Sequence, residues 1–170
     1  MSIPMGGAQT LLTIGALMLL SSVILSLNNA ILGRGIMNYE SEAILTATSL
    51  AQSLLEEVRT RSFDQQTLPP NRVSNPSYLT TGGNLGTEAG EVSTGDFDDV
   101  DDYNEFGRIV ATSRLGDFKG EVEVYYVQSG NLLDALNYQT YLKRIDVRVA
   151  NMYIGTPDQT ITLSTVIAYR

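Results

Sequence analysis

The chain has 170 residues, which is enough for one ordinary domain and an added segment. It contains no cysteine and no histidine, which excludes disulfides, thiolate metal sites and histidine-mediated proton transfer. The formal net charge of −8 is concentrated in one region, because no basic residue occurs between Arg72 and Arg108. The eight acidic residues of that region equal the whole excess of negative charge: Glu88, Glu91, Asp96, Asp98, Asp99, Asp101, Asp102 and Glu105. Without a basic patch to neutralise phosphates, we expect no nucleic-acid partner.

The first part of the chain is apolar on every side. Residues 1–8, MSIPMGGA, are uncharged and lack the basic region of a secretory signal, so we expect a short leader or an N-terminal extension. Residues 11–32 form an apolar run long enough to cross about 30 Å of hydrocarbon as a helix. We therefore predict a transmembrane helix over residues 9–35. A helix buried in a protein core is the alternative.

Small and polar residues interrupt this helix. Ser21 and Ser22 are tolerable in lipid, because each hydroxyl can donate a hydrogen bond to a carbonyl about one turn back. Small residues such as Gly15 let helices approach closely, although apolar helices often contain Gly and Ala without that role. Each glycine of Gly33-Arg34-Gly35 weakens a helix by about 1 kcal/mol. The sequence therefore predicts a bend or local unwinding there.

From Met37 onward the pattern is that of an amphipathic helix. Apolar residues recur every three or four positions and mark one face: Ile36, Tyr39, Ala43, Ile44, Ala47, Leu50, Ala51, Leu54, Leu55 and Val58. Within that face, Ala43, Ala47 and Ala51 form a smooth strip against which a sheet could pack. We expect the helix to end near Phe63, before the breaker pair Pro69-Pro70.

The second half of the chain predicts a loop and then a sheet. Residues 64–106 are rich in Gly, Pro, Asn, Ser and Thr and show no sustained period, which is typical of a long irregular connection. Four runs with alternating apolar and polar residues then predict strands, at residues 108–115, 120–127, 141–153 and 160–169. The expected fold class is α+β, with the long helix packed on a roughly four-stranded antiparallel sheet over residues 107–170 and a globular domain over residues 36–170.

This order of elements resembles that of bacterial type IV pilins and of the pseudopilins of type II secretion. The stretch SLAQSLLEEVRTRSFD is similar to the end of the long helix in minor pilins of the mannose-sensitive haemagglutinin type. FDDVDDYNEF is similar to an acidic motif that often follows in such proteins. The resemblance implies a structural subunit with a pilin-like fold that forms a homo-oligomeric helical filament. It also implies an inner-membrane precursor, assembly by pilus or type II secretion machinery, and a final location at the cell surface.

The resemblance also implies which residues take part in assembly. It aligns Gln9 with the first residue after cleavage, and Thr13 with a glutamate that pairs with the free amine of a neighbouring subunit. Thr13 carries no charge, so that pairing cannot operate, which favours a minor or tip subunit. The expected assembly residues are Gln9, Thr13, Gly15, Leu17, Leu20, Ile24, Leu27, Gly33, Arg34 and Gly35.

An apolar N-terminal helix also occurs in two other classes of protein. A single-pass membrane-anchored binding domain would need the same apolar helix but no filament. A membrane-anchored enzyme is disfavoured, because the sequence shows no nucleophile–base pair, phosphate loop or metal triad. We therefore expect no enzymatic activity.

One stretch is a candidate binding site. It places five carboxylates within seven residues: Asp96, Asp98, Asp99, Asp101 and Asp102. Oxygen donors at that density suit Ca²⁺, which takes roughly six to eight oxygen ligands. The spacing differs from that of a helix–loop–helix calcium site. The other interpretation is a solvated acidic turn that caps a short helix at residues 100–104 or pairs with Arg59 and Arg61. The sequence indicates no other cofactor.

Overall fold

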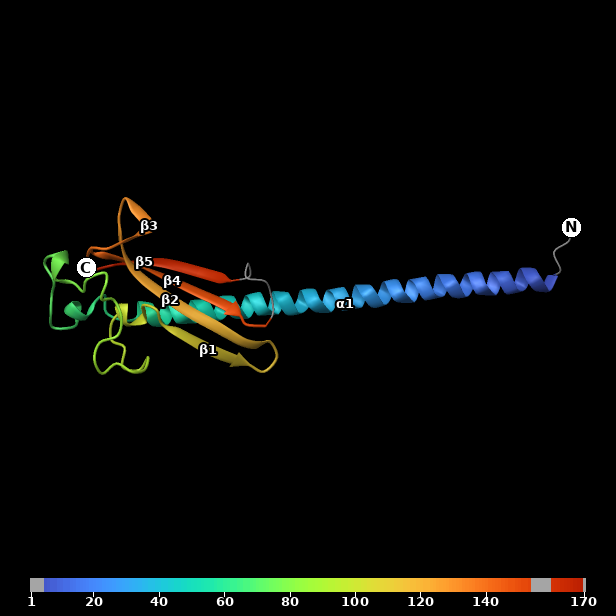
Figure 1. The fold of residues 1–170 in the computed structure, drawn as a ribbon, viewed down its shortest axis with the longest axis horizontal. Helices are drawn as coiled ribbons and strands as arrows, with labels where there is room; N and C mark the ends of the chain where they lie inside the picture. The colour runs from blue at the N-terminus through green and yellow to red at the C-terminus, as the bar shows by residue number, and fades with distance from the viewer. Residues whose placement is uncertain (1–4, 154–159, 170) are drawn as a thin grey trace. The chain divides into compact units, whose positions relative to one another are not determined.

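The computed structural model describes residues 5–153 and 160–169, so residues 1–4 of the expected leader lie outside it. The chain divides into two compact units, residues 1–42 and 43–170, each described by itself. Helix α1, Met5–Arg59, supplies the described part of the first unit and the first element of the second (Figure 1). It ends about one turn before the expected position near Phe63. The next residues instead approach another part of the chain through the bridge Ser62–Asp99.

The first unit is a helix whose apolar side chains lack cover. Thirteen large apolar side chains within residues 11–32 are at least half exposed: Leu11, Leu12, Ile14, Leu17, Met18, Leu19, Leu20, Val23, Ile24, Leu25, Leu27, Ile31 and Leu32. α1 contains a stretch long and apolar enough to cross a membrane, and none of that stretch is buried. Of the two interpretations of this segment, the described structure therefore excludes a helix buried in the core of its own chain.

Ser21 and Ser22, within the apolar run of the first unit, are satisfied within the helix. Ser21 Oγ donates to the carbonyl of Leu17 at 2.8 Å, and Ser22 Oγ donates to that of Leu19 at 2.8 Å, as the sequence predicts. The expected unwinding at Gly33-Arg34-Gly35 is absent, because α1 continues through these residues without interruption. Helix propagation is cooperative, so two glycines weaken such a helix without breaking its hydrogen-bond ladder.

The second unit contains one antiparallel sheet, which confirms the α+β class. Its strands are β1 (Gly107–Thr112), β2 (Gly116–Gln128), β3 (Asn131–Leu136), β4 (Leu142–Asn151) and β5 (Ile161–Ala168). The order is β1-β2-β4-β5, and β3 also pairs with β2. The sheet has five strands, where the sequence predicts roughly four. The missed strand, β3, has the sequence NLLDAL, whose adjacent leucines break the alternation that identifies a half-buried strand.

Both edges of β2 are used. One edge pairs with β4, while β1 and β3 pair with opposite ends of the other edge. The gap between β1 and β3 is closed by the segment that precedes β1. There the N–H of Val122 donates to the carbonyl of Phe106 at 2.9 Å, and the N–H of Val124 donates to Asn104 Oδ1 at 3.1 Å. The end of the long connection thus completes the ladder of the sheet.

The core lies between α1 and one face of this sheet (Figure 1). The alanine strip Ala43, Ala47 and Ala51 is buried there, as the sequence predicts. Larger buried residues complete the core: Leu54, Val58, Phe118, Val122, Val124, Ile145, Val147 and Val149. The small alanines let the helix lie close to the sheet, because no side chain beyond Cβ separates the two layers.

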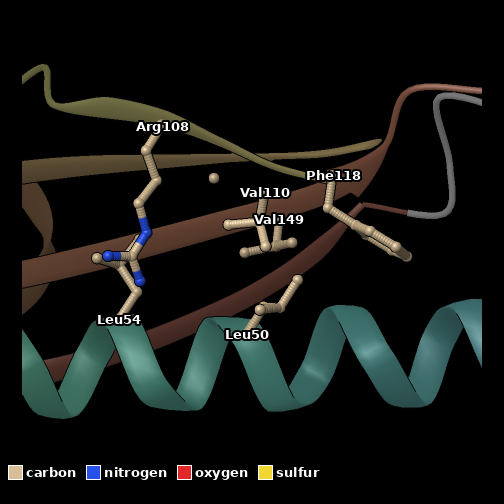
Figure 2. A pocket seen from close by; sticks show the side chains of 7 residues that line it. Leu50, Leu54, Arg108, Val110, Phe118 and Val149 are labelled. Atoms are coloured by element: carbon tan, nitrogen blue, oxygen red, sulfur yellow. The ribbon is translucent and has the colours of Figure 1, made fainter. Parts of the chain in front are cut away.

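Figure 2 shows one end of this core, where Leu50 and Leu54 point from α1 toward the sheet. Gly120 of β2 faces Leu54, and a Cβ at Gly120 would lie 3.4 Å from Leu54 Cδ2. The remaining cavity has a volume of about 10 Å³, which is space for about one water molecule. This end of the core is therefore packed and offers no ligand site.

Candidate metal centre

The long connection between α1 and β1 is structured. It contains three short 3₁₀ helices, η1 (Gln65–Thr67), η2 (Pro76–Tyr78) and η3 (Asp101–Tyr103). The acidic stretch is fixed beside the end of α1 by backbone hydrogen bonds. The N–H of Ser62 donates to the carbonyl of Asp98 at 3.2 Å, and the N–H of Val100 donates to the carbonyl of Ser62 at 3.0 Å. The short helix expected at residues 100–104 is thus present as η3.

Glu57 fixes η3 to the helix and to the first strand. The hydroxyl of Tyr103 donates to Glu57 Oε1 at 3.1 Å, and Arg108 Nη1 of β1 lies 3.0 Å from Glu57 Oε2. Tyr103 also packs edge-to-face against Phe97 and Phe106, with ring centroids 5.0 Å and 5.6 Å away. These contacts hold the acidic stretch in a defined conformation.

A buried lysine neutralises part of the acidic region. Lys143 of β4 is fully buried, and its ammonium donates to Asp64 Oδ2 at 2.9 Å, to Asp101 Oδ1 at 2.7 Å and to the carbonyl of Phe63 at 2.8 Å. The hydroxyl of Tyr126 adds a hydrogen bond to Asp64 Oδ2 at 3.0 Å. Burial alone would raise the pKa of Asp64, but the Lys143 charge and the hydrogen bonds outweigh it and the pKa is lowered. One cation thus serves two buried carboxylates.

Asp99 and Asp102 each use only one carboxylate oxygen. Asp99 Oδ1 accepts from the N–H groups of Asp101 and Asp102, at 2.8 Å and 3.3 Å. Asp102 Oδ2 accepts from the N–H groups of Asp98 and Asp99, at 2.9 Å and 3.1 Å. The second oxygens, Asp99 Oδ2 and Asp102 Oδ1, are buried and have no hydrogen-bond partner. Both side chains are almost completely buried, so bulk solvent does not reach these two oxygens.

Glu88 adds a third carboxylate to this pair. Glu88, Asp99 and Asp102 offer oxygens that all lie within 4.8 Å of one another, and Glu88 Oε2 is also buried without a partner. A second group, Glu91, Asp98 and Asp102, shares Asp102 with the first. Among the described residues, no ion pair connects Glu88, Asp99 or Asp102 to a lysine or arginine.

The electrostatics of this cluster disfavour three free carboxylates. Burial, followed by the nearby Asp101, raises the pKa of Asp99 to about 10. Burial, followed by Glu91 and Asp102, raises the pKa of Glu88 to about 8. Burial also raises the pKa of Asp102, although hydrogen bonds from the backbone oppose the shift. At Asp99 the charge of Lys143 opposes the shift, but burial and the neighbouring carboxylates outweigh it, so the charged form is disfavoured at all three residues.

The structure divides the five predicted site residues. It brings Asp99 and Asp102 together with Glu88, and it places the exposed Asp98 in the second group. Asp101 Oδ1 pairs with Lys143, while Asp101 Oδ2 is buried without a hydrogen-bond partner, as one oxygen of Asp99 and of Asp102 is. Asp96 lies apart, because its exposed carboxylate accepts from Ser93 Oγ at 2.8 Å. Neither of the two carboxylate groups among the described residues includes Asp96 or Asp101.

The interpretation as a solvated acidic turn is wrong for Asp99, Asp101 and Asp102, which are buried, whereas Asp96 and Asp98 are exposed. Neither Arg59 nor Arg61 forms the predicted ion pair with Asp99, Asp101 or Asp102. Arg59 pairs with Glu56 at 2.8 Å, and Arg61 Nη2 donates to the carbonyl of Thr94 at 3.0 Å.

The sequence reasoning missed four residues of this region: Glu88, Glu91, Asp64 and Lys143. One signal could have identified Lys143. It lies two residues before Ile145, so strand alternation places it on the buried face of β4. A lysine at a core-facing position indicates a buried carboxylate partner.

The predicted assembly residues all lie on α1. Six of them, Gln9, Thr13, Leu17, Leu20, Ile24 and Leu27, are spaced by three or four residues and form one stripe along the helix. The hydroxyl of Thr13 donates to the carbonyl of Thr10 at 2.8 Å, which satisfies it within the helix. By helical periodicity, Gly15 and Gly33 lie on the opposite side from this stripe.

A long N-terminal helix whose later part packs on an antiparallel sheet is compatible with a pilin-like fold. Comparison of the chain with protein-family models, with curated proteins and with solved structures finds no match.

Proposed function

We propose that this chain is a structural subunit of a type IV pilus-like filament, held in a membrane before assembly by residues 9–35. The observation that carries the proposal is the exposure of thirteen large apolar side chains on the first unit. A helix that is apolar on every side requires lipid or other helices around it.

The magnitude of this exposure makes an isolated, water-soluble helix untenable. Full burial of one large apolar side chain contributes roughly 1.5–3 kcal/mol. Because thirteen such side chains are each at least half exposed, covering them is worth on the order of 10–20 kcal/mol. That is comparable with the net stability of a folded domain, about 5–15 kcal/mol. Transfer of the helix from lipid into a bundle of neighbouring helices would keep this surface covered.

Two features favour assembly over a plain anchor. The order of elements and the two local motifs resemble pilins, in which the N-terminal helices bundle in the filament. The stripe from Gln9 to Leu27 also has a spacing of three or four residues, with which helices pack against each other. Thr13 within this stripe favours a minor or tip subunit, because it cannot form the charge pair that the resemblance implies for a major one.

Electron microscopy of surface material sheared from the native cells tests the proposal. Filaments that label with an antibody against residues 43–170 would support it. A chain found only in detergent-extracted membranes, with none in the sheared fraction, would favour the single-pass membrane-anchored binding domain instead. N-terminal sequencing of the native protein adds a second readout, since a start at Gln9 would indicate processing of the kind that pilin precursors undergo.

A further inference from the structure

We propose that neighbouring copies of this chain join edge to edge, with the outer edge of β5 in one copy paired antiparallel with the outer edge of β1 in the next. The inference rests on the proposed filament, because a helical filament requires every copy to face the same way. It names a contact between the sheets of neighbouring subunits. All the residues that it uses belong to the second unit, residues 43–170.

β1 and β5 are the outermost strands in the order β1-β2-β4-β5 (Figure 1). Within the part of the chain that the structure describes, each pairs with a single strand, β1 with β2 and β5 with β4. The N–H of Tyr169 donates to the carbonyl of Tyr141 at 3.0 Å, which fixes the alternation of the β4–β5 ladder. The main-chain groups of every second residue of β5 therefore point to the open edge: Thr162, Ser164, Val166 and Ala168.

The open edge of β1 follows from the same alternation. The N–H of Val122 donates to the carbonyl of Phe106, so the next residue of the chain and every second one after it direct their main-chain groups away from β2. These residues are Gly107, Ile109 and Ala111. The sheet thus offers unpaired donors and acceptors along both outer strands.

Neither edge has the usual protection against pairing with another strand. Residues 160–169 contain no charged residue and no proline, and the register between β4 and β5 is continuous. The charged residue of β1, Arg108, donates to Glu57 of α1. Val166 and Ile109 are 36% and 62% exposed on these edges. Edge strands without charges, prolines or bulges are suited to the addition of a further strand.

The strand directions select which edges meet. Each of the neighbouring pairs β1–β2, β2–β4 and β4–β5 is antiparallel, so β1 and β5 run in opposite directions. A second copy shifted sideways in the plane of the sheet therefore places its β1 antiparallel to β5 of the first copy. The α1 residues 43–59 of both copies then lie on the same face and point the same way. Antiparallel pairing of two β5 edges would instead reverse one helix, which a filament of equivalent subunits does not allow.

The charges at the two edges are complementary. An open cleft of about 410 Å³ lies at the end of β5, and its described lining includes Arg59 and Arg61 and no acidic residue. Another open cleft, of about 290 Å³, lies where the chain enters β1, and three of its lining residues are acidic: Glu105, Glu121 and Glu123. Its basic lining residue, Arg148, pairs with Glu123. Antiparallel pairing places the end of β5 beside the start of β1, so the basic cleft of one copy meets the acidic cleft of the next.

One register uses both the apolar and the charged residues. It pairs Ile109 of one copy with Val166 of the next, the two large exposed apolar side chains of these edges. Gly107 then lies opposite Ala168, and the exposed Glu105 comes to the edge at which Arg59 and Arg61 lie. In such a hydrogen-bonded antiparallel pair the two Cα atoms are about 5.5 Å apart, which is within the range of a disulfide, about 4.4–6.8 Å.

Disulfide crosslinking of the full chain tests this register, because the chain has no cysteine of its own. The variant Ile109→Cys/Val166→Cys replaces the wild-type chain in native cells, and both sheared surface material and membranes are oxidised and run on non-reducing gels. We expect a ladder of dimers, trimers and larger species, because each copy carries both halves of the contact. The single variants should stay monomeric, and a mixture of the two should give dimers only.

Val92→Cys combined with Ile109→Cys is the matched control. Val92 is 90% exposed but lies outside both edge strands, so this variant should give no ladder. Glu105→Arg, added to the Ile109→Cys/Val166→Cys variant, should reduce the yield of the ladder roughly fivefold, because it places like charges together. Addition of Arg59→Glu should restore the yield, because opposite charges then meet again.

The outcomes separate the edge contact from the filament itself. Labelled filaments that give no ladder would overturn the edge contact and leave the filament proposal intact. A ladder in the membranes of cells that make no filaments would support the edge contact and contradict the filament. Dimers from Val166→Cys alone would indicate pairing between two β5 edges and overturn the proposal. A ladder of equal yield from the Val92→Cys control would overturn it as well, because it would indicate random collision.

Discussion

The ammonium of Lys143 lies 2.7 Å from the carboxylate of Asp101, across 42 residues of sequence, and both side chains are fully buried. The same ammonium contacts Asp64 and lies 4.8 Å from the ring centroid of Phe63. Lys143 thus joins β4 to both ends of the long connection between α1 and β1. The second unit therefore depends on an electrostatic contact at its centre in addition to its apolar core.

Replacement of this lysine should be strongly destabilising. Lys143→Met leaves Asp64 and Asp101 buried without a cation, and breaking a buried pair in this way costs about 3–5 kcal/mol. Denaturant unfolding of the full chain in detergent measures the change. Lys119→Met is the control, because the Lys119–Glu121 pair is half exposed and should contribute no more than about 1 kcal/mol. Equal losses for the two variants would contradict a special role for Lys143.

Removal of one hydroxyl tests the polar network around Asp64. The single hydroxyl proton of Tyr126 is shared between Asp64 Oδ2, at 3.0 Å, and the carbonyl of Thr80, at 2.7 Å. We expect Tyr126→Phe to lower the free energy of unfolding by about 1.5–3 kcal/mol, because the lost bonds are buried and one partner is charged. Tyr138→Phe, which affects an exposed hydroxyl, should change it by less than about 0.5 kcal/mol. If Tyr126→Phe left the free energy of unfolding unchanged, a water molecule would have replaced the hydroxyl.

The helix–sheet core gives a prediction about packing. Leu54 is 1% exposed and contacts the sheet beside Gly120, so Leu54→Ala should destabilise residues 43–170 by about 2–5 kcal/mol. Leu45 lies on the exposed side of the same helix. Leu45→Ala should stay within about 0.5 kcal/mol of the wild type. Chemical unfolding followed by circular dichroism measures the stability of both variants. A larger loss of stability in Leu45→Ala than in Leu54→Ala would contradict the packing of the Leu54 face of α1 on the sheet.

The acidic cluster predicts an unusual dependence of stability on pH in the absence of divalent cations. The pKa values of Asp99 and Glu88 in the folded state are raised, to about 10 and about 8. Unfolded carboxyl groups titrate near pH 4, so between pH 4 and those values the folded state binds more protons than the unfolded state. Their contribution to stability is therefore full below pH 4 and is lost as the pH rises. In EGTA, we expect the Tm to fall steadily from pH 5 to pH 9.

Ca²⁺ should flatten this dependence, because the ion favours the deprotonated carboxylates. The matched measurement is the same pH series with Ca²⁺ in excess. If the Tm in EGTA stayed constant or rose between pH 5 and pH 9, the pKa values of Asp99 and Glu88 would not be raised in the folded state.

A charge placed in the first unit tests the membrane interaction. Leu20 is more than half exposed on α1, and a lysine near the centre of a spanning helix costs about 2.5–3.5 kcal/mol. We expect Leu20→Lys to reduce the fraction of the chain that remains in membranes after carbonate extraction. Leu45→Lys, in the second unit, should leave that fraction unchanged. Retention of both variants at the wild-type level would contradict a spanning role for residues 9–35.

Periodicity predicted much of this fold. The three- and four-residue spacing of Ala43, Ala47 and Ala51 located the buried helix face, and alternation located most of the sheet. Periodicity did not predict β3, because residues 131–136 form a strand only by pairing with the last residues of the long strand β2. Leu132 and Leu133 are partly or largely exposed there, so no apolar face marks the strand.

The candidate site was harder to predict, because its members meet only through tertiary structure. The density of acids located Asp99 and Asp102. It could not distinguish Asp101, which Lys143 of β4 neutralises, from its neighbours, because that contact depends on the register of the sheet. Asp96 differs for a local reason, the turn in which Ser93 donates to it. The density of acidic residues in the sequence therefore identifies the region, whereas the fold determines which carboxylates have a lysine or a hydroxyl as a partner.

The way in which the edge of β2 is closed has a consequence for solubility. The N–H groups of Val122 and Val124 are paired by Phe106 and Asn104, which belong to no strand. If residues 96–106 lost their order, these donors would become a short open edge of the kind to which a strand from another chain can add. The acidic connection thus protects the sheet from edge-to-edge association. Conditions that loosen the connection should promote aggregation before they unfold the helix–sheet core.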